Sequence, residues 1–135
     1  MANEAGNEAL AAAFYLARHD PAWQARPYWM LRRCVVPYVE ARQFLLLGAE
    51  GVPAGFAAWA RGKAGRPEPW REDRYLPSAA EIAGDGEACV TELIAPEVET
   101  SRVLDEVARH LGLPGRPAWI ERDAERRVVA VHAKS

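Results

Sequence analysis

The sequence is poor in lysine, cysteine and histidine, with two lysines, two cysteines and three histidines in 135 residues. Cys34 and Cys89 lie far apart and form no CxxC or metal-binding spacing, so we expect two buried free thiols rather than a disulfide. The positive charge is therefore nearly all arginine, which suits bidentate contacts with carboxylates but is also typical of a GC-rich genome. The net charge of −2 gives no reason to expect nucleic-acid binding.

Long hydrophobic runs are also missing. The apolar run at residues 9–17 is too short to span a bilayer, and the first twenty residues lack a basic segment of the kind that begins a signal peptide. We interpret this run as a helix and expect a cytoplasmic protein with no membrane span. With 50% hydrophobic and 27% charged residues, the composition is that of a globular chain, and the length suits one domain over residues 1–135.

Motifs for metals, cofactors and serine catalysis are absent from the sequence. No histidine has a partner four residues away or a neighbouring cysteine, and no serine lies in a nucleophile elbow. The segment at residues 109–114 is one residue short of the turn that binds acetyl-CoA in acetyltransferases, and it ends a helix instead of beginning one. We therefore expect no metal, no cofactor and no coenzyme A of that kind.

Hydrophobic periodicity predicts several helices. Leu10, Ala13, Phe14 and Ala17 recur at helical spacing up to Pro21, and a second helix begins near residue 27. Because proline lacks an amide hydrogen, we expect that second helix to kink or end early at residue 37. A short helical stretch follows at residues 78–83. The most regular pattern is at residues 100–111, where Thr100 or Ser101 is expected to cap the start and Gly112 the end.

Strands are predicted where the periodicity changes. Residues 43–47 and 52–60 read as a hairpin around the loop at 48–51, and residues 88–95 form a single strand stopped by a proline. A last hairpin joins residues 118–122 to 127–133. This order predicts an α/β (α+β) fold of the acetyltransferase-like kind: a mixed, mostly antiparallel sheet flanked by helices and crossed once by a strand–helix–strand unit.

The acidic residue Glu92 is the most informative position in the strands. Strand alternation places it on the same face as Val90 and Ile94. A carboxylate among branched apolar side chains is costly unless it is paired or carries a raised pKa, and a raised pKa would suit acid–base catalysis. Two alternatives remain open at this point: this face of the sheet is exposed to solvent, or Glu92 pairs with one of the arginines.

Three segments together resemble the RTX toxin-activating protein-lysine acyltransferases. They are residues 37–47 (PYVEARQFLLL), 51–60 (GVPAGFAAWA) and 92–96 (ELIAP), in the family's order and at comparable spacing. Residues 117–132 resemble the family's closing hairpin, and the similarity covers about residues 10–133. The resemblance implies an acetyltransferase-like fold without the acetyl-CoA turn, and transfer of a fatty acyl group from acyl-carrier protein to an internal lysine.

The family's two functional residues match this chain unequally. Its aspartate falls on Glu92, which is longer by one methylene, whereas its histidine falls on Trp23, within the segment Asp20-Pro21-Ala22-Trp23. An indole N–H donates a hydrogen bond but cannot accept a proton near neutral pH. His19 is the candidate substitute, although a histidine at the end of a helix is also a common cap.

Two hypotheses follow for the function. In the first, the protein is an acyltransferase in which Glu92 orients or accepts a proton and His19 is the base. Acyl-carrier protein is acidic and would dock on Arg26, Arg32 and Arg33, which also fit an ordinary solvated helix face. The substrate would be a lysine of a protein or peptide. Members of the family often form dimers, so a homodimer is one arrangement to expect.

In the second hypothesis the scaffold has lost catalysis and acts as a binding module. Trp23, Tyr28 and Trp29 would then line the old cleft and hold a peptide or a partner enzyme, because buried aromatic residues make good anchors. The same aromatic residues also fit plain core packing between the first two helices.

Overall fold

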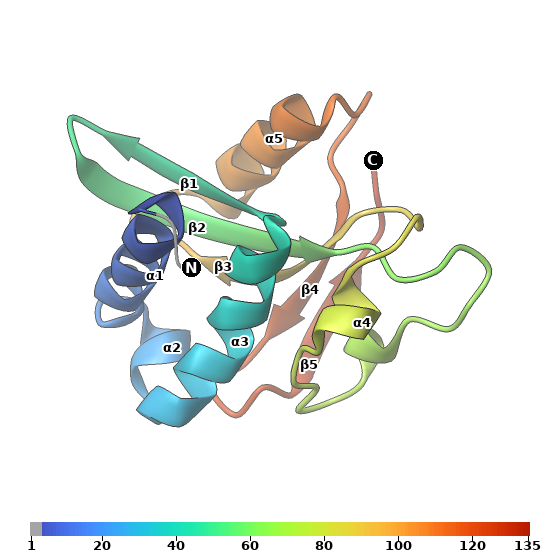
Figure 1. Ribbon diagram of the computed structural model, residues 1–135, viewed down its shortest axis with the longest axis horizontal. Helices are drawn as coiled ribbons and strands as arrows, with labels where there is room; N and C mark the ends of the chain where they lie inside the picture. The colour runs from blue at the N-terminus through green and yellow to red at the C-terminus, as the bar shows by residue number, and fades with distance from the viewer. Residues whose placement is uncertain (1–3) are drawn as a thin grey trace.

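The computed structural model describes residues 4–135, and it has an α/β architecture built on one five-stranded sheet (Figure 1). The strands follow the order β1-β2-β3-β4-β5 across the sheet, and all neighbours are antiparallel except β3 and β4. The elements along the chain are α1 (Glu4–Ala17), α2 (Pro21–Gln24), α3 (Tyr28–Ala41), β1 (Phe44–Ala49), β2 (Val52–Ala60), the 3-10 helix η1 (Pro69–Arg71), α4 (Ala79–Ile82), β3 (Cys89–Ile94), α5 (Thr100–Leu111), β4 (Ala118–Arg122) and β5 (Val128–His132).

Helices cover both faces of the sheet, which gives the predicted mixed fold its layers. The first three helices lie on one face and α5 lies on the other, as Figure 1 shows. The side chains of β2 alternate between the two cores: Phe56 and Ala58 pack with the helices of the first face, whereas Ala57 and Trp59 pack with α5. This alternation is the reason why β2 reads as a continuous apolar run in the sequence.

The helix α3 runs through Pro37 to Ala41, so of the two outcomes expected at this proline, a kink or an early end, the early end does not occur. Proline removes one backbone hydrogen bond, but burial of Cys34, Val35, Tyr38 and Val39 against the sheet outweighs that loss. The helix ends instead at Arg42, whose φ of 58° is left-handed.

The two predicted hairpins form, with a tighter first turn than expected. Strand β1 continues through Gly48 and Ala49, so the turn consists of Glu50 and Gly51, which both have positive φ. Two successive positive φ values are the geometry of a type I′ turn, which matches the twist of a hairpin. The sequence-based prediction had assigned all of residues 48–51 to the loop.

The strand–helix–strand unit consists of β3, α5 and β4, and it has the predicted bounds for its helix. Its apolar stripe, including Val103 and Val107, is buried, and Gly112 ends the helix with a φ of 68°. The N-terminal cap differs from expectation. The cap residue is Glu99, whose side chain makes no capping hydrogen bond within the described chain, and Thr100 is already helical. In residues 4–135, no helix is long and apolar enough to cross a membrane.

Candidate active site

A cavity lies where strands β3 and β4 part. The two strands are paired at Cys89 with Ala118 and at Val90 with Trp119, and no further pairs between them occur in the described part of the chain. Beyond this point a space of about 260 Å³ opens between the strands, lined by both and by α2 and the start of α5. We call it the β3–β4 cavity. Its lining includes Trp23, Arg26 and Glu92, together with Asp20 and Glu121.

A β-bulge in β3 decides which way Glu92 points. Ala58 on β2 pairs with Glu92, and the next residue, Trp59, pairs with Val90, so Thr91 is the extra residue. A bulge shifts the alternation of side chains by one position. Glu92 and Ile94 therefore lie on the face of the sheet that packs against α3, whereas Val90 lies on the opposite face and packs against α5. The expectation that Glu92 shares a face with both residues is wrong for Val90.

Glu92 forms a buried ion pair with Arg126. The guanidinium donates from Nη1 to Oε1 at 2.7 Å and from Nη2 to Oε2 at 3.2 Å, and both side chains are 1% exposed. Burial by itself would lower the pKa of Arg126, but the Glu92 carboxylate raises it above its ordinary value. Of the two alternatives considered from the sequence, the structure shows pairing with an arginine.

Arg126 reaches Glu92 from the turn between β4 and β5. Its φ of 63° is left-handed, and Asp123 holds the turn by accepting hydrogen bonds from the backbone N–H groups of Glu125 and Arg127. The same guanidinium donates twice to the carbonyl oxygen of Tyr75. This residue was not singled out from the sequence, because arginines are numerous and a turn residue is expected to be exposed.

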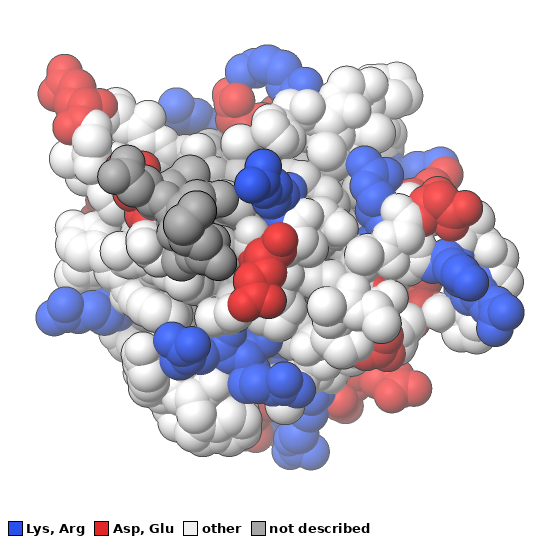
Figure 2. Space-filling view, in the orientation of Figure 1, with Lys and Arg blue, Asp and Glu red and all other residues white. Residues whose placement is uncertain are grey.

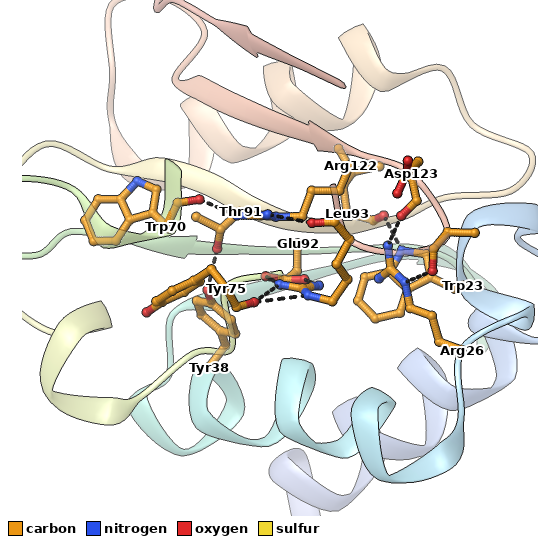
Figure 3. A network of polar contacts seen from close by, with 12 residues as sticks. Trp23, Arg26, Tyr38, Trp70, Tyr75, Thr91, Glu92, Leu93, Arg122 and Asp123 are labelled. Atoms are coloured by element: carbon orange, nitrogen blue, oxygen red, sulfur yellow. Dashed lines mark hydrogen bonds and ion pairs between the residues drawn. The ribbon is translucent and has the colours of Figure 1, made fainter. Parts of the chain in front are cut away.

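The helix α3 supports the bulge from below. The hydroxyls of Tyr38 and Thr91 are hydrogen-bonded, which ties the extra residue of the bulge to the helix. Burial, followed by the nearby Glu92 carboxylate, raises the pKa of Tyr38 and raises that of the Cys34 thiol to about 12. Figure 3 shows Tyr38, Tyr75 and Glu92 close together between the strand and the helices.

Trp23 caps the part of the β3 edge that β4 leaves unpaired. It lies in α2, which begins with Pro21 after Asp20, whose carboxylate accepts from the N–H of Ala22. The indole is 3% exposed and donates from Nε1 to the carbonyl oxygen of Leu93 at 3.0 Å. Trp23 thus satisfies a backbone group that β4 leaves unpaired, and it lines the cavity beside Glu92.

Arg26 packs on Trp23 and lines the same cavity. Its guanidinium carbon lies 4.2 Å from the indole centroid, which is a cation–π contact. Its Nη2 donates to the carbonyl oxygen of Asp123 at 2.8 Å and its Nε to that of Ala124 at 3.4 Å. Figure 3 shows Trp23, Arg26 and Asp123 together at one end of the network.

The other residues proposed from the sequence lie outside the lining of this cavity as the structure describes it. His19 is exposed in the turn after α1, with its ring against Tyr15 at 5.2 Å between centroids. Tyr28 and Trp29 are exposed by 61% and 56% at the start of α3. Arg32 and Arg33 are exposed on the same helix.

A second group of side chains in the lining was not anticipated. Glu121 on β4 contacts Nε2 of His132 on β5 at 3.1 Å, and the His132 ring stacks on Trp119 with centroids 4.5 Å apart. Glu121 and Trp119 line the cavity. The predicted last hairpin was the available signal, since cross-strand neighbours on one face are in contact. In residues 4–135, no group of three or more His, Cys, Asp or Glu side chains is arranged to hold a metal ion.

Comparison with known protein families identifies the family to which this fold belongs. The model of a family described as RTX toxin acyltransferases matches residues 2–130. The chain belongs to the RTX toxin acyltransferase family. No curated protein matches it closely enough to count as a relative. In this family member, Glu92 is paired with Arg126 and Trp23 is hydrogen-bonded to the edge of β3.

Proposed function

We propose that the protein transfers an acyl group from acyl-carrier protein to a lysine of a protein or peptide, and that the transfer takes place in the β3–β4 cavity. The observation that supports this proposal is the opening of the sheet beside Glu92 in a chain that belongs to an acyltransferase family. In the proposal, the reacting end of the acyl-carrier arm enters the space between the parted strands.

The reaction requires the lysine nitrogen to bond to the acyl carbon while the carbon–sulfur bond breaks and the carrier thiol leaves. The amine must first lose a proton, because a lysine is mostly protonated at neutral pH. A second proton leaves the nitrogen after attack and passes to the departing sulfur.

We assign these steps to two residues, one in the cavity wall and one just outside it. In the proposal, Glu92 is a positioning residue, since its carboxylate is held by Arg126. His19 is the proposed proton acceptor, because it is an exposed imidazole that directly precedes the cavity residue Asp20.

The proposed docking surface for the acidic carrier protein is the outer face of α3. Arg32 and Arg33 are exposed there, whereas Arg26 is buried against Trp23 and serves the cavity instead. Figure 2 shows basic side chains gathered over the region where Figure 1 places α2 and α3. Tyr28 and Trp29 add exposed aromatic area beside these arginines.

A second candidate function is an inactive binding module that holds a peptide or a partner enzyme. The bond from Trp23 to Leu93 supports it: by the family resemblance Trp23 stands where a base is expected, and its indole N–H can only donate. Such a module would use the β3–β4 cavity and the exposed aromatic residues for binding.

One experiment separates the two functions. The purified protein is incubated with acyl-carrier-protein thioester and lysine-containing candidate substrates, and acylated products are measured by mass spectrometry. Acyl transfer supports the enzyme. A tight complex without transfer by the unmodified protein supports the binding module.

Variants then test the residues. In the enzyme, His19→Ala is expected to reduce kcat by about 10²-fold or more, the usual contribution of a general base. His110→Ala is the matched control, since His110 is also exposed but lies on α5. Equal rates for both variants would remove His19 from the mechanism.

A further inference from the structure

The acidic groups in the β3–β4 cavity are all engaged with other groups. Glu92 is paired with Arg126, and Glu121 contacts His132. Asp20 accepts the N–H of Ala22 at the start of α2. Each of these three carboxylates therefore has a hydrogen-bond partner within the protein, and that of Glu92 is an arginine.

Two of the three cavity arginines have no such partner. Among the residues that the structure describes, Arg26 and Arg122 form no ion pair with a carboxylate and donate to backbone carbonyl oxygens only. Each also has one buried N–H nitrogen without a hydrogen-bond acceptor in the described chain, Nη1 of Arg26 and Nε of Arg122.

A buried guanidinium with an unused donor is costly. Arg26 is 6% exposed, and a carbonyl oxygen satisfies a hydrogen bond without neutralising the charge. Burial lowers the pKa of Arg26 and of Arg122. A ligand that brings a negative charge and an oxygen acceptor would satisfy both needs at once.

We infer that the β3–β4 cavity binds a small carboxylate, with the guanidinium of Arg26 as a donor to it. A carboxylate offers two oxygens in the plane that suits a guanidinium. The space of about 260 Å³ is below the range of roughly 300–1,000 Å³ of most small-molecule sites, so it accommodates the charged end of a ligand and not a long chain. This site does not depend on the proposed acyl transfer.

The test uses sodium butyrate and the neutral isostere butyramide as probes, with sodium chloride added to equal ionic strength. Nitrogen-15 NMR spectra of the full chain report the indole N–H of Trp23 and the backbone amides of Arg26, Leu93 and Thr100, which all line the cavity. Butyrate is expected to shift these signals saturably, whereas butyramide and chloride leave them in place.

Variants assign the donor. Arg26→Gln is expected to weaken butyrate binding by about tenfold or more, the loss of one charge-assisted hydrogen bond. Arg32→Gln, at an exposed arginine of α3, is expected to bind as the unmodified protein does. If Arg26→Gln does not fold, Arg26→Lys keeps the charge while losing the forked donors, and the shift map of the unmodified protein still tests the position.

Several results would overturn the inference. An equal response to butyramide would show that charge is not recognised, and an equal response to chloride would mean an adventitious ion only. Shifts confined to residues outside the cavity, no saturable shift at all, or unchanged binding by a folded Arg26→Gln protein would each refute the site. None of these outcomes depends on acyl transfer. The carboxylate site can therefore be confirmed or refuted even if the protein proves not to be an acyltransferase.

Discussion

Removing the carboxylate of Glu92 should destabilise the fold far more than removing a surface carboxylate whose ion pair has the same shortest N–O distance. The pair between Glu92 and Arg126 has an N–O distance of 2.7 Å with both side chains 1% exposed. The pair between Glu106 and Arg109 has the same 2.7 Å distance, with exposures of 35% and 74%. The two pairs share this shortest distance but differ in burial, and the buried pair also has a second N–O contact at 3.2 Å.

The magnitude follows from the charge that is left behind. Glu92→Leu leaves the Arg126 guanidinium buried without its counter-charge, which costs about 3–5 kcal/mol. Glu106→Leu removes an exposed pair and should cost less than about 1 kcal/mol. With a urea m-value of about 2 kcal/mol per molar, the first change lowers the unfolding midpoint by about 1.5–2.5 M.

Urea unfolding followed by tryptophan fluorescence measures both variants, and a double-mutant cycle isolates the pair. Arg126→Met alone leaves Glu92 unpaired, while the double variant Glu92→Leu with Arg126→Met removes both charges. The double variant should therefore cost less than the sum of the single changes by at least about 2 kcal/mol. Additive costs, or a Glu92→Leu effect as small as that of Glu106→Leu, would refute the reasoning.

Three further predictions concern thiols, alkaline pH and glycine. Burial raises the pKa of Cys34 and Cys89 to about 12, so iodoacetamide at pH 8 should label neither thiol in the folded protein and both in urea, as read by mass. Because the unfolded thiols lose their protons near pH 8.5 and the folded ones retain them, stability should be full below about pH 8 and decline toward pH 12; a urea midpoint equal at pH 8 and pH 10.5 would contradict this. A Cβ on Gly84, at a φ of 155°, would lie 1.7 Å from a backbone oxygen, whereas Gly65, at a φ of 80°, has open space. Gly65→Ala should therefore lower the free energy of unfolding by about 1–2 kcal/mol through backbone strain, and Gly84→Ala should lower it by clearly more. Equal urea midpoints for the two variants would contradict this.

The helix at residues 100–111 and the two hairpins were predictable because each follows from local pattern. In α5 the buried stripe repeats at helical spacing, and Gly112 ends it in the conformation that glycine adopts at low cost. The continuation of α3 through Pro37 was not predictable in this way. Local chemistry favours an interruption there, and only the packing of Tyr38 and Val39 on the sheet overrules it.

The position of the candidate site could be predicted from the sequence, but the contacts of its side chains could not. The strand around Glu92 could be located from its pattern, but the bulge at Thr91 has no local signature, since it arises from register against β2. Without the bulge, alternation would place Glu92 with Val90 against α5. The partner Arg126 comes from a turn that meets β3 only in the folded chain.

The distribution of charge in the β3–β4 cavity sets a condition on any lysine that reacts there. Glu92 is paired with Arg126, whereas Arg26 and Arg122 form no ion pair with a carboxylate in the described chain and each has one buried N–H without an acceptor. The positive charge of these guanidinium groups disfavours a lysine ammonium beside them, so the amine has to lose its proton, to His19 in the proposal, before it attacks. Acyl transfer in this cavity should therefore accelerate with pH through neutrality, because the neutral fraction of lysine grows. A rate that falls between pH 7 and pH 9 would show that the lysine reacts elsewhere or that a carboxylate is released to receive it.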